Sequence, residues 1–192
     1  MLRKLIVKGR RVATNYAHIY CKMKRKGTIF FVRIAVEAAL YFVLTFFVPA
    51  ISYGPLQFRV GEALTLLPII FPEATIGVTI GCLLANVFSP YAWYDMVFGT
   101  LATLISAVAT YYIGKGLKDK KLWLKCLIGG IPPIVVNALV LPLIWYITGT
   151  DLGYFINMGM IALTQAGAVW VLGTPLVLGL DKAKLAIKIG NK

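Results

Sequence analysis

One uncharged apolar stretch decides the fold class: residues 126–150 read CLIGGIPPIVVNALVLPLIWYITGT. No Asp, Glu, Lys or Arg interrupts it. A helix rises about 1.5 Å per residue, so a helix of this length can cross the roughly 30 Å hydrocarbon core of a bilayer. The stretch therefore predicts a membrane-spanning segment rather than the core of a soluble domain.

The rest of the chain has the same character. Of its 192 residues 59% are apolar and only 14% are charged, whereas about a quarter of the residues of a soluble domain are charged. The second and third apolar segments are short and cover only part of a bilayer. We predict an all-α integral membrane protein with six transmembrane helices at Phe30–Pro49, Glu62–Phe71, Ala74–Phe88, Asp95–Ile113, Leu122–Ile147 and Tyr154–Leu180.

The basic residues predict the orientation of these helices. Eighteen of the twenty Lys and Arg fall in three clusters: residues 1–27, Lys115–Lys125 and Lys182–Lys192. Each cluster is preceded by an even number of predicted spans, so the positive-inside rule places both termini in the cytoplasm. We expect a basic leader (1–27), a six-helix domain (28–180) and a basic tail (181–192) in the cell membrane. Charge that flanks apolar spans argues against a nucleic-acid partner.

Several kinds of chemistry have no support in the sequence. There is no Gly-x-x-x-x-Gly-Lys-Ser/Thr loop for nucleotide hydrolysis. The single histidine, His18, lies in the leader, and the cysteines Cys21, Cys82 and Cys126 show no metal-ligand spacing. We therefore expect no enzyme activity, no metal site and no cofactor.

Polar and aromatic side chains gather in the outer half of the predicted bundle. Polar groups inside a membrane are costly, so their position indicates function. Aromatic faces with a few amides and carboxylates suit a flat, polar, heterocyclic ligand. The candidate ligand-binding residues are Tyr53, Gln57, Arg59, Glu62, Asn86, Trp93, Tyr94, Asp95, Asn137 and Gln165.

Most of these candidates also have a purely structural interpretation. The aromatic residues at the outer end could form an interfacial belt: Trp93, Tyr94, Trp145, Tyr146 and Tyr154. Asn86 and Asn137 could hydrogen-bond between helices, and Asp95 could be an exposed N-cap of the fourth span. Arg59 and Glu62, three residues apart, could simply pair with each other. The residues alone leave these alternatives open.

Small residues on the first span suggest a place for close helix contact. Ala35 and Ala39 are four residues apart, with Ala38 beside them. This spacing lets two helix backbones approach closely, either inside the bundle or at a partner protein.

Four segments resemble one family of membrane transporters. They are YGPLQFRVGEALTLLP (53–68), GCLLAN (81–86), DMVFGTLAT (95–103) and LGTPL (172–176). They are similar to the QueT family of queuosine-precursor transporters, which are substrate-binding S components of energy-coupling-factor (ECF) importers. The resemblance covers about Thr28–Leu180 and leaves out the basic leader.

The resemblance implies a six-helix S component. Such a subunit associates with a membrane scaffold subunit and two ATPases, which would account for the missing nucleotide loop. Ala35 and Ala39 would dock on the scaffold. Two alternatives remain: an S component for another vitamin or nucleobase, and a small secondary transporter that is active as a dimer.

The implied ligand is a 7-deazaguanine or queuine. Glu62 or Asp95 would accept the N–H donors of its guanine-like edge, because a carboxylate can accept two donors at once. The remaining edge would meet Gln57, Asn86, Asn137 or Arg59, and Tyr53, Trp93 or Tyr94 would stack on the ring. Family members often carry a carboxylate at the position of Gln165. A neutral amide there predicts either preference for a less basic precursor or another carboxylate in that role.

Overall fold

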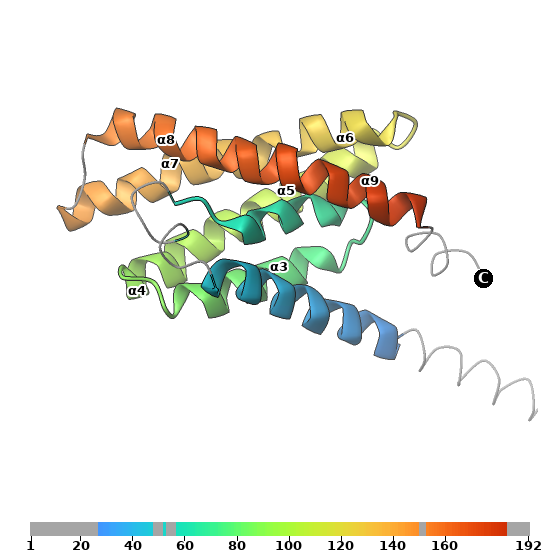
Figure 1. Ribbon diagram of the computed structural model, residues 1–192, viewed down its shortest axis with the longest axis horizontal. Helices are drawn as coiled ribbons and strands as arrows, with labels where there is room; N and C mark the ends of the chain where they lie inside the picture. The colour runs from blue at the N-terminus through green and yellow to red at the C-terminus, as the bar shows by residue number, and fades with distance from the viewer. Residues whose placement is uncertain (1–26, 48–51, 53–56, 150–152, 184–192) are drawn as a thin grey trace, which may run out of the picture. The chain divides into compact units, whose positions relative to one another are not determined.

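The computed structural model describes residues 27–47, 52, 57–149 and 153–183 (Figure 1). The predicted leader, most of the basic tail and Tyr53 lie outside these ranges. Within them the chain forms helices joined by turns, with no strand. The first helix spans Gly27–Phe46. The others are η1 (Val60–Ile69), α3 (Ala74–Asn86), α4 (Ala92–Tyr94), η2 (Asp95–Gly99), α5 (Thr100–Gly116), α6 (Leu122–Gly129), α7 (Ile131–Thr148), α8 (Tyr154–Ala166), η3 (Gly167–Gly173) and α9 (Thr174–Lys182).

Four of the described helical segments are long and apolar enough to cross a membrane: Gly27–Phe46, Asp95–Gly116, Leu122–Thr148 and Tyr154–Lys182. Two further apolar helices, η1 and α3, are shorter. Many large apolar side chains on the long helices are exposed, which suits contact with lipid rather than water. The prediction of an all-α fold with helices long and apolar enough to cross a membrane is confirmed for the described residues, whereas the number of spans and the orientation remain predictions.

The short helix η1 lies among the others and carries the centre of the candidate site. It is a 3₁₀-helix that contains Pro68, and eight of its ten residues are buried. It packs against α5 and η3, and is the short teal helix in the middle of Figure 1. A Cβ atom on Gly173 would lie 2.6 Å from the carbonyl oxygen of Ala63, so the glycine allows this close approach. The chain thereby places Glu62, 1% exposed, deep among the helices.

The first helix packs against α3 through glycines. A Cβ atom on Gly81 would lie 2.7 Å from the carbonyl oxygen of Ala38 and 2.6 Å from the Cβ of Tyr41. Gly77, one turn earlier on α3, is equally close to the side chain of Glu37. Small residues four apart thus bring the two helices into contact. This packing buries Tyr41 completely.

Replacing Gly81 with alanine is expected to destabilise the protein by about 1–3 kcal/mol, because the added methyl group must displace backbone atoms. Gly159, which is exposed on α8 and has no atom within 4 Å of an added Cβ, is the matched control. Its replacement with alanine should leave stability unchanged or raise it slightly. Denaturant titration in detergent micelles measures both variants. Equal stabilities would show that α3 and the first helix are not in close contact.

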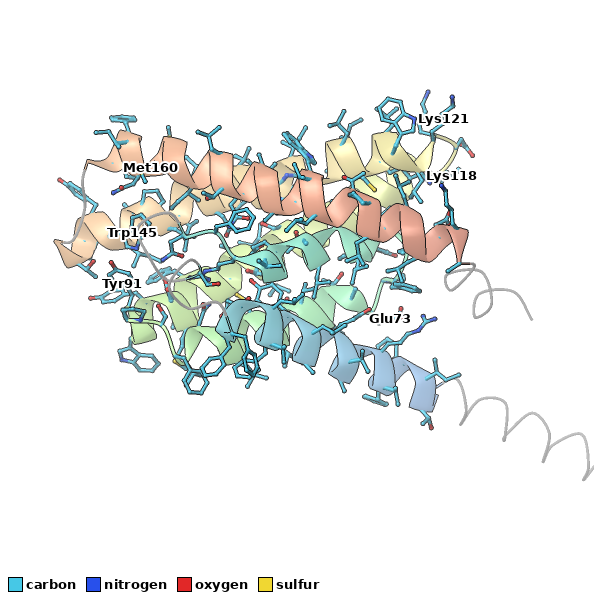
Figure 2. The ribbon with its side chains drawn as sticks, viewed as in Figure 1. Glu73, Tyr91, Lys118, Lys121, Trp145 and Met160 are labelled. Atoms are coloured by element: carbon cyan, nitrogen blue, oxygen red, sulfur yellow. The ribbon has the colours of Figure 1, made fainter. Side chains whose placement is uncertain are left out.

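The two ends of the helices differ in chemistry. Lys118 and Lys121, in and next to the turn between α5 and α6, lie at one end, whereas Tyr91 and Trp145 lie at the other (Figure 2). The aromatic end also carries Trp93, whose side chain is 74% exposed. Lysine and exposed aromatic side chains are both typical of membrane–water interfaces.

Candidate functional site

A buried arginine organises the polar centre of the molecule. Arg59, 2% exposed, donates from Nε to Gln57 Oε1 at 3.1 Å. Its Nη1 donates to Asn86 Oδ1 at 2.9 Å, and Nη2 forms an ion pair with Asp95 Oδ2 at 3.1 Å. The end of α3 and the start of η2 therefore meet the segment just before η1 at one guanidinium group, and Asp95 neutralises the positive charge inside the bundle.

Local backbone geometry brings Asn86 and Asp95 to Arg59. Asn86 ends α3, and its Nδ2 donates to the carbonyl oxygen of Asp95 at 2.8 Å. Ser89 Oγ donates to Asp95 Oδ2 at 2.5 Å. A Cβ atom on Gly99 would lie 3.0 Å from Asn86 Nδ2, so glycine lets the amide sit against the π-helical turn η2.

The interpretation of Asp95 as an exposed N-cap is wrong. Helical structure already begins at Ala92, and Asp95 is fully buried. Its carboxylate points into the ion pair instead of capping a helix end. Asp95 therefore pairs with Arg59 inside the bundle. The spacing of the two residues in the sequence did not indicate this contact.

Glu62 forms the second part of the polar centre. Its Oε1 accepts a 2.5 Å hydrogen bond from the hydroxyl group of Tyr41 on the first helix. The side chain of Asn137 on α7 lies next to it. The carboxylate of Glu62 and the amide of Asn137 thus lie close enough to interact, yet within the described residues neither Glu62 Oε2 nor Asn137 Nδ2 completes a hydrogen bond of good geometry.

Further buried polar atoms share this property. A buried polar group without a partner costs free energy, and such groups are rare unless a ligand or water completes them. Within the described part of the chain, the candidate residues that carry such atoms are Gln57 (Nε2), Glu62 (Oε2), Asp95 (Oδ1), Asn137 (Nδ2) and Gln165 (Nε2 and Oε1).

Gln57 also has an unusual backbone. Its φ angle of 45° lies in the left-handed region, which is uncommon for a residue other than glycine. The conformation coincides with a fully buried side chain that accepts the Arg59 hydrogen bond. Strained backbone of this kind is often found at ligand sites.

Other candidates lie away from this centre. Trp93 and Tyr94 are 74% and 41% exposed, and with Val97 and Phe98 they line a surface hollow of about 270 Å³. Ala35 and Ala39 are exposed on the first helix, whereas Ala38 is buried. The structure therefore separates a buried polar centre from an exposed aromatic hollow and an exposed alanine pair.

Sequence reasoning missed two members of the centre, Tyr41 and Ser89. A tyrosine within an apolar span was a usable signal, because a buried hydroxyl group needs a partner. Ser89 precedes a proline and indicated only a turn. In the described ranges no group of three His, Cys, Asp or Glu could hold a metal ion. The arrangement offers donors and acceptors suited to binding a polar ligand.

Comparison with known proteins gives the family. The QueT transporter family matches residues 31–182. A protein named "Queuosine precursor transporter QueT" from Lactococcus lactis subsp. cremoris (strain MG1363) is 39% identical over 103 residues, which cover 53% of this chain and 60% of that relative. No solved structure matches the chain. Since the family match extends from the first helix to α9, this chain belongs to the QueT transporter family, a family of transporters rather than enzymes.

Proposed function

We propose that this protein is the substrate-binding S component of an ECF importer and takes up a queuosine precursor, a 7-deazaguanine or queuine. In this proposal the chain crosses the cell membrane six times with both termini in the cytoplasm, and η1 and α3 are its two short membrane segments. The family and the name of the Lactococcus lactis relative support transport of such a precursor.

The proposal is carried by two neighbouring buried groups, the carboxylate of Glu62 and the amide of Asn137, whose Oε2 and Nδ2 atoms complete no hydrogen bond of good geometry within the described residues. The edge of a 7-deazaguanine presents two N–H donors next to a carbonyl acceptor. Glu62 would accept the two donors, and Asn137 would donate to the carbonyl oxygen. Charge-assisted hydrogen bonds of this kind are strong in a medium that excludes water.

The other candidate residues have supporting roles in this proposal. The ion pair between Arg59 and Asp95 fixes the site, with Gln57 and Asn86 holding the guanidinium group. The neutral amide of Gln165 adds a donor and an acceptor without charge. Tyr53, Trp93 and Tyr94 would stack on the ring as the ligand enters.

A binding panel on the purified subunit in detergent tests the proposal. We expect 7-deazaguanine to bind, and 7-deazaadenine to bind at least tenfold more weakly, because its edge has an acceptor where Glu62 needs a donor. Isothermal titration calorimetry measures both affinities. Binding of an unrelated vitamin with no response to deazaguanines would instead support an S component for a different substrate.

The exposed alanine pair is the proposed contact with the scaffold subunit. Replacing Ala39 with tryptophan should abolish co-purification of the scaffold and the two ATPases with a tagged chain, because the bulky ring prevents close helix contact. Ligand affinity should not change. Gly159→Trp, at an exposed site on α8, is the control and should retain the partners. A wild-type chain that co-purifies only with copies of itself would support the dimeric secondary transporter instead.

A further inference from the structure

A second pair of buried polar groups lies toward the aromatic end of the bundle. Trp145 on α7 is 4% exposed, and Asn157 on α8 is 2% exposed. Within the described ranges, the indole Nε1 of Trp145 and the amide Nδ2 of Asn157 have no hydrogen-bond partner. Both are N–H donors.

The antiparallel packing of α7 and α8 indicates that these two residues lie at the same level along the bundle. The helices pack side by side (Figure 1). Gly149 follows the last residue of α7, and Gly153 precedes the first residue of α8. Trp145 lies four residues before Gly149, and Asn157 lies four residues after Gly153. Positions equally far from the turn of an antiparallel hairpin lie at the same level along the helices. Trp145 and Asn157 therefore form one polar layer.

Counting residues from the α7–α8 turn also places this layer closer to the turn than the proposed base-binding site. Asn137 and Gln165 each lie eight residues farther from the turn, on the same helix faces as Trp145 and Asn157, because positions i, i+4 and i+8 share a face. Eight residues correspond to about 12 Å along a helix. Between the two polar layers, Leu141 and Ile161 belong to one buried apolar cluster. A bicyclic base with a small substituent has about this length, so a ligand that reached both layers would lie along Leu141 and Ile161, which would line it rather than fill the space between the layers.

The outer layer offers donors and no unbalanced negative charge. The ring of Tyr91 lies 6.2 Å from that of Trp145. The neighbouring element η2, which packs on α7, contributes Asp95, whose charge is balanced by Arg59. Two buried N–H groups without a partner favour an acceptor on the ligand, whereas an ammonium group, itself only a donor, would leave both of them unpaired.

We propose that Trp145 and Asn157 form an outer subsite that donates hydrogen bonds to an uncharged, acceptor-bearing substituent at the 7-position of the ligand. The proposal rests on the proposed function, because it assumes that the base edge binds at Glu62 and Asn137. It specifies the substrate class: a 7-deazaguanine with a nitrile or hydroxyl-bearing substituent is preferred over one with an alkylammonium group.

Calorimetry with three ligands tests the subsite: 7-deazaguanine, its 7-cyano derivative and its 7-aminomethyl derivative. The wild type should bind the cyano compound about tenfold more tightly than the aminomethyl compound. Trp145→Phe removes the N–H group and keeps most of the ring. It should weaken cyano binding about tenfold and leave unsubstituted 7-deazaguanine unaffected. Tyr146→Phe, at a side chain that is 66% exposed, is the control and should change nothing.

A reversal of preference gives the sharper test. Asn157→Asp places a carboxylate in the outer layer, so the aminomethyl compound should become the tighter ligand. Wild-type preference for the aminomethyl compound, or an equal loss for substituted and unsubstituted bases in Trp145→Phe, would overturn the subsite and leave the proposed function intact. If none of the three compounds binds the wild type, it is the proposed function that fails.

Discussion

Replacing Arg59 with leucine is expected to lower the free energy of unfolding by about 3–5 kcal/mol, the usual cost of breaking a buried ion pair. The change leaves Asp95, fully buried, with an uncompensated charge. It also removes the donors that Gln57 and Asn86 accept from. Three buried side chains lose their common partner at once, so the effect should exceed that of any surface substitution.

Denaturant titration in detergent micelles measures this loss. Lys120→Leu, which removes an exposed positive charge from the turn between α5 and α6, is the matched control and should change stability by less than about 0.5 kcal/mol. The double variant Arg59→Leu/Asp95→Leu should be more stable than Arg59→Leu alone, because no unpaired charge remains buried. A single variant as stable as the control would contradict the network.

The long helices were predictable because a bilayer imposes length and composition. The expected spans Leu122–Ile147 and Tyr154–Leu180 differ from the observed segments Leu122–Thr148 and Tyr154–Lys182 by at most two residues at their ends. The described part of the first helix, Gly27–Phe46, covers most of the expected span Phe30–Pro49 and includes three residues before it. A membrane span needs an unbroken apolar run, which is visible in the sequence itself. These helices could therefore be located without knowing how they pack.

The partners within the site could not be predicted in the same way. Spacing allowed a local contact between Arg59 and Glu62, whereas the observed ion pair joins Arg59 to Asp95, 36 residues away. The pair depends on how α3 and η2 pack, which no local pattern encodes. Trp93 and Trp145 lie toward the same end of the bundle, yet one is exposed and the other buried, because only Trp145 faces the contact between α7 and α8.

Glu62→Gln is expected to weaken 7-deazaguanine binding by roughly 30- to 150-fold, or about 2–3 kcal/mol. The amide that replaces the carboxylate keeps one oxygen, which can still accept the Tyr41 hydrogen bond. Its NH₂ group, however, would face an N–H donor of the base. The loss should therefore appear in affinity and leave the stability of the protein close to that of the wild type.

The most direct measurement of the central claim is calorimetric titration of 7-deazaguanine into three proteins: wild type, Glu62→Gln and Asp119→Asn. The last removes an exposed carboxylate from the turn between α5 and α6. We predict wild-type affinity for Asp119→Asn and a loss of at least 30-fold for Glu62→Gln. Equal affinities in all three proteins would show that the buried carboxylate does not hold the ligand.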